Sequence, residues 1–166
     1  MRTIELAPEA ADEILTTRHL AAPRALVFEA WTTPEHVAAW WGPTGFTTTT
    51  REMRVATGGV WRFTMHGPDG TDYPNRIRFI EVVVPERLVY DHDHDHDDAG
   101  GDAPGFHVVV TFDEDGDGTF LAMRAKFASA EARRYVAENV KAVEGARQTV
   151  DRLVEHVARM AARNPA

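Results

Sequence analysis

One group of residues could bind a metal ion, the alternating histidines and aspartates of residues 91–98. On an extended strand His92, His94 and His96 would point to one side and the aspartates to the other, because successive side chains of a strand alternate. Two imidazoles at i and i+2 can bind one zinc or a similar ion. We interpret the run instead as an acidic strand end that continues into a loop. We expect no metal and no other cofactor. If a metal were bound here, the three histidines would be its candidate ligands.

A second acidic stretch, residues 113–118 (DEDGDG), begins like a calcium-binding loop of the D-x-D-x-D-G type. The twelfth position of such a loop carries a bidentate glutamate in calcium-binding proteins. Here that position is Arg124, and the flanking residues favour strands rather than helices. We therefore predict a hairpin turn over this stretch and no calcium site.

The residues that could support catalysis are scattered along the chain. There is no cysteine, no G-x-S-x-G motif and no H-E-x-x-H motif, so the common nucleophile and metalloprotease patterns are missing from the sequence. Single groups that could act as an acid or a base are Glu29, Glu52, His66, Glu81 and His92. The sequence alone places no pair of them at working distance. We therefore assign no catalytic residue.

The composition argues against several kinds of partner. The chain has 166 residues, a net charge of −8 and a pI of about 5.4. An acidic surface disfavours electrostatic binding of nucleic acid or of an anionic membrane. No apolar run approaches the ~20 residues that a membrane-spanning helix needs, and the N-terminus lacks the apolar segment of a signal peptide. We expect a cytoplasmic monomer or homodimer that binds neither nucleic acid nor membrane.

The elements that must position these groups follow from the periodicity of the apolar residues. Alternating or β-rich stretches predict seven strands, over residues 13–20, 46–55, 60–66, 72–84, 87–94, 106–112 and 119–127. Two short helices are predicted between the first two strands. They begin near Pro23 and at Thr33, because proline suits the first helical turn and threonine is a favourable N-cap. Residues 1–12 show no period and predict a flexible tail, and residues 13–163 form a single domain.

Trp40 and Trp41 are adjacent on the second short helix, so they cannot face the same way. In one arrangement both pack against the edge of the sheet. In the other, one is in the core and its neighbour lies near the mouth of a cavity or on the surface, where it could contact a partner. The sequence leaves both arrangements open.

The last helical region, residues 129–163, is amphipathic after Gly145. Its apolar residues have the i, i+3, i+4, i+7 spacing of one helix face, and they are Val150, Leu153, Val154, Val157 and Met160. We predict a break or kink near Gly145, because glycine costs ~1 kcal/mol inside a helix. Antiparallel strands followed by one long amphipathic helix bury both when the sheet curls around the helix. The predicted fold class is therefore α+β, of the helix-grip kind: a curved antiparallel sheet of about six to seven strands wrapped around the C-terminal helix.

Four stretches follow one another in an order that is known from other proteins. They are TTPEHVAAWWGP (32–43), GGVWRFTMHGPDGTDYPNRIRFIEVVVPERLVY (58–90), VVVTFDEDGDGTFLAMR (108–124) and EGARQTVDRLVEHVA (144–158). Together they resemble the SRPBCC superfamily of START and birch-pollen-allergen-like proteins. Within it the chain is similar to the bacterial branch named after the activator of the heat-shock-protein (Hsp) ATPase. The resemblance covers about residues 13–162 and implies a deep, mostly apolar cavity between sheet and C-terminal helix, with no fixed catalytic residues.

Side chains on the inner faces of the strands and on the apolar face of the last helix would line such a cavity. A few polar groups among them would orient a ligand. The residues that we expect to line it are Trp61, Phe63, Met65, Tyr73, Arg78, Tyr90, His92, Phe106, Val108, Met123, Val150 and Val154. Each of them could also simply fill the core, as such residues usually do.

We expect the protein to bind a small hydrophobic or amphipathic molecule in this cavity, without established catalysis. One alternative is an enzyme, a cyclase or a hydrolase that acts on a polyketide-like substrate, as some members of the superfamily are. That activity needs two convergent titratable groups in the cavity. The other alternative is a co-chaperone-like interaction module, which needs an exposed surface rather than an open pocket.

Overall fold

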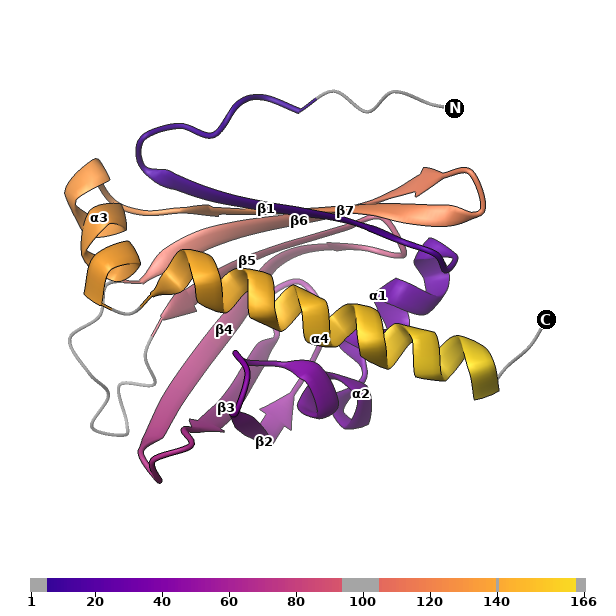
Figure 1. The fold of residues 1–166 in the computed structure, drawn as a ribbon, viewed down its shortest axis with the longest axis horizontal. Coiled ribbons are helices and arrows are strands. Elements are labelled where there is room, and N and C mark those ends of the chain that lie inside the picture. Colours follow the sequence, from indigo (N-terminus) through magenta and orange to yellow (C-terminus); the bar gives the residue numbers. More distant parts are fainter. Residues whose placement is uncertain (1–5, 94–104, 140, 164–166) are drawn as a thin grey trace.

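A curved antiparallel sheet of seven strands forms the body of the protein (Figure 1). The computed structural model describes residues 6–93, 105–139 and 141–163. The strands are β1 (Glu13–Leu20), β2 (Thr47–Met53), β3 (Val60–His66), β4 (Asp72–Val83), β5 (Arg87–Asp93), β6 (Phe106–Asp115) and β7 (Gly118–Lys126). Their order is β1-β7-β6-β5-β4-β3-β2, so that β1 and β2 are the edges. All seven predicted strands are present.

The described residues form four helices, which are α1 (Arg24–Thr32), α2 (Pro34–Trp40), α3 (Ala130–Asn139) and α4 (Ala142–Arg163). α4 crosses one face of the sheet, and its backbone packs beside β1, α1, α2 and α3 (Figure 1). This arrangement confirms the predicted α+β helix-grip class. None of the described helices combines the length and the apolar character that crossing a membrane requires.

Local sequence explains how two of the helices begin. Pro34 occupies the first turn of α2 together with Glu35, where a proline costs no hydrogen bond and an acid interacts favourably with the helix dipole. α3 begins after Ser129, whose Oγ accepts a hydrogen bond from the backbone N–H of Ala132 at 3.0 Å. Both helices begin where the sequence predicts, although Thr33 at the N-cap of α2 makes no capping hydrogen bond with its side chain.

The predicted break near Gly145 is misplaced. The last helical region is interrupted between Asn139 and Ala142, and Lys141 there has a positive φ of 56°. Gly145 lies inside α4, and its N–H donates to the carbonyl of Lys141. A Cβ at this glycine would come 3.4 Å from Cγ of Pro43. The glycine thus lets α4 pass close to the segment that joins α2 to β2, and it does not end the helix.

Two shifts in strand register accompany the curvature of the sheet. The pairing of β2 with β3 shifts between Thr50 and Glu52, and that of β4 with β5 shifts between Phe79 and Glu81. An extra residue on one strand of a pair bends that strand and increases its twist. The sheet can therefore curl around α4.

The acidic stretch between β6 and β7 is a tight hairpin, as predicted. Asp115 pairs with Gly118, and Gly116 at the turn has a φ of 63°. The strands extend further into the stretch than the sequence analysis allowed, because the pairing continues through Glu114 and Thr119.

All four tryptophans are in the core, and each is 7 % exposed or less. The ring centroid of Trp40 is 4.9 Å from that of Trp31 and 5.4 Å from that of Trp41, which in turn is 4.9 Å from Trp61. The indole N–H of Trp40 donates to the carbonyl of Ala30 at 2.9 Å, so this buried polar group is satisfied. Of the two open arrangements, the one with both adjacent tryptophans buried is correct.

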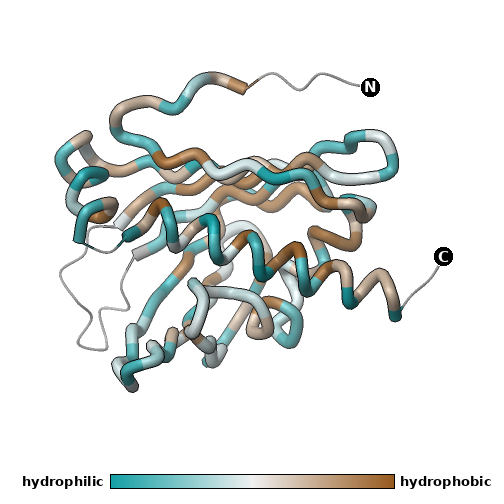
Figure 2. The backbone as a smooth tube through the Cα atoms, in the orientation of Figure 1, coloured by the Kyte–Doolittle hydropathy of each residue, from teal (hydrophilic) through white to brown (hydrophobic). Residues whose placement is uncertain are grey.

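α4 buries the face that its periodicity predicts. Figure 2 shows hydrophobic and hydrophilic residues alternating along this helix and along the strands of the sheet. Its buried residues are Val150, Leu153, His156, Val157 and Met160, and Val154 is half-buried. His156 is the one polar member of this set of buried residues.

Arg152 ties α4 to the end of α2. Its guanidinium donates to the carbonyl oxygens of Trp41, Gly42 and Pro43 at 3.4, 2.8 and 3.2 Å. Carbonyl groups at a helix C-terminus lack donors within the helix, and the arginine supplies these donors. Burial lowers the pKa of this guanidinium, which nevertheless stays protonated because arginine titrates so far above neutral pH.

Residues 7–12 of the predicted tail lie against one edge of the sheet. Arg124 donates to the carbonyls of Ala7 and Pro8, and a carboxylate oxygen of Glu9 accepts the N–H of Leu15 at 2.7 Å. The last bond occupies a backbone donor of β1, an edge strand whose outward groups would otherwise face solvent.

Candidate functional site

The centre of the space between the sheet and α4 is filled by side chains. Trp61 and Phe63 stack there with ring centroids 4.0 Å apart. Five of the residues expected to line a cavity are 2 % exposed or less and belong to the packed core; they are Trp61, Phe63, Tyr90, Val108 and Val150. These side chains therefore occupy the space in which the resemblance implies a cavity.

The phenol of Tyr90 is the one ionisable group among these five residues. Burial raises its pKa far above the ordinary value, because the charged form would be poorly solvated. Tyr90 is therefore neutral at physiological pH. It can take part in a hydrogen bond, but it cannot serve as a base.

Side chains are less completely buried where β5 ends and β6 begins. Nε2 of His92 donates to Oδ1 of Asn75 at 2.9 Å, and the His92 ring centroid lies 4.7 Å from that of Phe106 and 5.9 Å from that of Phe63. A polar pair is thus set between aromatic rings. Together with the nearby half-buried Met65 it forms what we name the entrance cluster, which consists of Met65, Asn75, His92 and Phe106.

Three other expected residues lie near the inner face with different exposure. Tyr73 pairs with Met65 across β3 and β4, is 44 % exposed, and has its ring 6.0 Å from that of Phe46. Met123 and Val154 are partly buried and pack against the core. These residues border the filled space.

Arg78 lies on the opposite face of the sheet from the other expected residues. Its neighbour Ile77 is buried and pairs with Trp61 and His92. Successive side chains of a strand alternate between the two faces, so the side chain of Arg78 must point outward. There its guanidinium forms an ion pair with Asp91 at 3.3 Å. The structure therefore does not bring Arg78 together with Trp61 and Tyr90.

The histidine run is described only in part. His94 and His96 lie outside the described residues, whereas His92 belongs to the entrance cluster and is held by Asn75. Across residues 6–93, 105–139 and 141–163, no three histidine, aspartate or glutamate side chains gather closely enough to hold a metal ion.

One chain of hydrogen bonds has the composition of a nucleophile, a base and an orienting acid. Oγ1 of Thr49 lies 2.8 Å from Nε2 of His66, whose Nδ1 lies 2.7 Å from Oδ1 of Asp72. The three residues are on the outer face of the sheet, opposite Phe63 and the core, and Thr49 and Asp72 are exposed. The arrangement is outside the cavity, so it does not supply the two convergent groups that the enzyme alternative needs.

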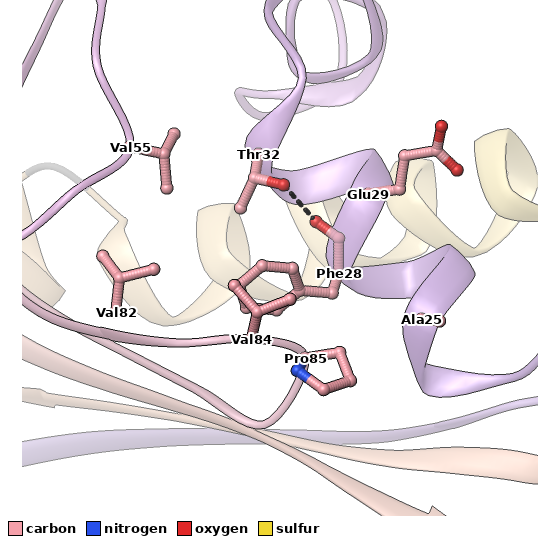
Figure 3. Close-up of a pocket in the computed structure, with 8 residues that line it drawn as sticks. All are labelled: Ala25, Phe28, Glu29, Thr32, Val55, Val82, Val84 and Pro85. Carbon is pink, nitrogen blue, oxygen red and sulfur yellow. Dashed lines mark hydrogen bonds between the residues drawn. The ribbon is translucent and has the colours of Figure 1, made fainter.

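Two hollows open at the end of the molecule near α1, away from the entrance cluster. The first, about 410 Å³, is a largely apolar groove between α1 and the end of β4 (Figure 3). It is lined by Ala25, Phe28, Glu29, Thr32, Val55, Val82, Val84 and Pro85. The second, about 460 Å³, is more polar, and its lining is Arg24, Val83, Glu86, Arg87, Thr111, Asp113 and Glu114. Sequence analysis missed both, because they are formed by segments distant in the chain.

The chain matches one protein family over residues 21–158, and the family is described as Activator of Hsp90 ATPase homolog 1-like protein. The match spans most of the domain, from just before α1 to the last turns of α4. No curated protein matches the chain.

Several solved structures have the same fold. A protein from Arthrobacter aurescens has a TM-score of 0.84 at 24 % identity, with 90 % of this chain and 87 % of that chain covered. A protein from Rhodobacter sphaeroides has a TM-score of 0.77 at 26 % identity, with 93 % and 97 % covered. The AHSA1 protein from Silicibacter pomeroyi has a TM-score of 0.72 at 18 % identity, with 89 % and 99 % covered. These similarities extend over almost the whole of each chain.

Proposed function

The chain belongs to the family of Activator of Hsp90 ATPase homolog 1-like proteins, and from this premise we propose that it binds a small apolar or amphipathic molecule between its sheet and α4. The molecule enters at the entrance cluster. Its apolar part contacts the aromatic rings, and a polar group of the molecule exchanges hydrogen bonds with the Asn75–His92 pair. We propose no catalytic step.

The observation that carries this proposal is the pairing of Asn75 with His92 among aromatic rings. Ligand sites in proteins are mostly apolar with a few placed polar groups, and this half-buried end of the core has that composition. Met65 supports it, because a methionine side chain adapts its shape at low cost when a ligand enters. Tyr90 lies deeper on the same face of β5, where its neutral phenol can bond a ligand that reaches the core.

Native mass spectrometry of freshly purified protein, compared with the mass under denaturing conditions, tests the proposal. A co-purified small molecule of apolar or amphipathic character would support it and identify the chemical class. If the protein is free of ligand, fluorescence titration with anilinonaphthalene sulfonate is the second measurement. A ligand-free protein that also fails to bind this probe would contradict the proposal.

A pair of variants locates the site. Phe106→Ala removes an aromatic wall of the entrance cluster and should weaken probe binding by about tenfold, the equivalent of roughly 1.4 kcal/mol. Val84→Ala removes a side chain that is 69 % exposed in the groove beside α1, and it should leave the affinity unchanged. The opposite pattern would move the ligand to the groove.

A second candidate function is a co-chaperone-like role, which the family description suggests. The feature that favours it is the groove in Figure 3, whose lining includes Val84, an aliphatic side chain that is 69 % exposed. Under this candidate the occupant is an Hsp90-type chaperone. Stimulation of such an ATPase by the protein, lost in Val84→Asp and kept in Phe106→Ala, would support this candidate over the first.

A further inference from the structure

Two histidines from distant parts of the chain meet between α2 and α4. Nδ1 of His36 lies 2.9 Å from Nε2 of His156, and the ring centroids are 5.1 Å apart with the planes inclined by 60°. His156 is only 8 % exposed, and His36 is half-buried. At this separation one of the two nitrogens donates an N–H and the other accepts the hydrogen bond with its lone pair. A single proton therefore lies between the two nitrogens.

The spacing of the rings also suits a metal ion. Two imidazoles on one tetrahedral zinc, with Zn–N bonds of about 2.0–2.1 Å, have ring centres roughly 5.2 Å apart and ligating nitrogens roughly 3.3 Å apart. The observed ring spacing is close to this value. To hold the ion, the two nitrogens would separate by a few tenths of an ångström and the rings would turn so that both lone pairs point at it.

The charges near the pair limit how tightly it can bind a metal. Arg159 and Arg163 lie near His156 on α4, and they repel a cation. The site should therefore be weaker than a structural zinc site with four protein ligands.

We propose that His36 and His156 form a binding site for a divalent transition-metal ion of the zinc class. The ion takes the place of the shared proton, which moves through solvent to the other nitrogen of the ring that carried it, so both imidazoles stay neutral, and water completes the coordination. Two protein ligands leave positions open, as in metal sites that exchange their ions. The bound ion would join α2, which carries Trp40, to α4 and so would fix one wall of the aromatic core. This proposal is independent of the proposed ligand function.

Zinc titration of metal-free protein by isothermal calorimetry tests the site. The parent for all measurements carries His94→Asn and His96→Asn, which removes two of the three histidines of residues 91–98 and leaves His92. We expect one zinc equivalent in this parent, at least about tenfold weaker binding in His36→Gln or His156→Gln, and a rise of Tm with zinc that both variants lose. His107→Gln is the matched control. The ring of His107 is also hydrogen-bonded, to Asp91, but it is distant in the chain from His36 and His156. This variant should bind zinc as the parent does.

Two results would overturn the proposal. One is a parent that binds no zinc equivalent, and the other is unchanged binding in His36→Gln. If His156→Gln fails to fold, as judged by its near-ultraviolet circular dichroism without metal, the half-exposed His36→Gln variant decides alone. Cobalt(II) gives an independent readout, because the parent should acquire the visible absorption bands of a low-symmetry ion with nitrogen ligands and His36→Gln should not.

Discussion

The space between the sheet and α4 has a closed end and a looser end, and they differ in their polar groups. At the closed end, Trp31 makes edge contacts with Trp40 and Trp41, and Trp41 makes one with Trp61. The polar indole group of Trp40 there already has a partner, the carbonyl of Ala30 on α1. At the entrance cluster, Asn75 and His92 form a polar pair between two strands among aromatic rings. Helices α1 and α2 supply most of the closed end, whereas strand residues form the entrance cluster. The difference teaches that the part of a packed core to consider as a ligand site is the part where inward-facing polar groups remain partly exposed.

The largest effect should come from the closed end. Trp61→Ala removes an indole that is 1 % exposed and stacked on Phe63, and truncation of such a side chain leaves a cavity. We expect the free energy of unfolding to fall by about 3–5 kcal/mol in urea denaturation. Tyr73→Ala, at a site that is 44 % exposed, is the comparison and should change it by less than about 0.5 kcal/mol. Equal losses in the two variants would erase the distinction between the ends.

Arg152→Ala should have the next largest effect. The change removes the hydrogen bonds from α4 to the carbonyls of Trp41, Gly42 and Pro43. We expect a loss of about 2 kcal/mol in the free energy of unfolding, since hydrogen bonds to a charged group are worth roughly 1.5–3 kcal/mol. Arg152→Lys should recover part of the loss, because an ammonium group can still donate to one or two carbonyls. A loss below 0.5 kcal/mol would show that these bonds do not hold α2 to α4.

A smaller effect on stability, with a larger one on binding, is expected at the entrance cluster. His92→Leu keeps an apolar side chain against Phe106 but leaves Oδ1 of Asn75 without this donor. The unfolding free energy should fall by only about 1 kcal/mol, because the site is half-buried. Fluorescence titration should show clearly weaker binding of anilinonaphthalene sulfonate. If stability falls as far as in Trp61→Ala while binding is unchanged, this end is ordinary core.

The smallest effect should be a pH dependence carried by His156. Its pKa in the folded protein is lowered below the ordinary value by burial, His36, Arg159 and Arg163, so the unfolded state binds a proton more readily. The stability that this depression contributes is fully present above the unfolded pKa of about 6.5, and it is lost as pH falls through the lower folded pKa. Urea denaturation at several pH values should therefore show less acid destabilisation in His156→Gln than in the unchanged protein. Parallel curves would contradict the assignment.

The face of the sheet on which several side chains lie followed from the sequence, and the exception has a definite cause. Alternation correctly places Trp61, Phe63 and Tyr90 on the inner face of the sheet. Trp61 and Phe63 are two positions apart on a regular stretch of β3, and Tyr90 lies on a regular stretch of β5. Tyr73 and Arg78 were expected to line the same cavity, yet they are five residues apart on one strand. The register of β4 against β3 is continuous between them, so they must point to opposite faces. Counting parity along this strand would have excluded one of them.

The sequence by itself determined the elements of this protein and their layering. Apolar periodicity depends only on neighbours along the chain, and it specified seven strands, two short helices and a long amphipathic C-terminal helix. Only the tertiary structure decided which polar groups meet. The contact of His36 with His156 spans 120 positions, and that of Asn75 with His92 depends on a register shift in β4. Such contacts depend on how whole elements pack, and no local pattern records them.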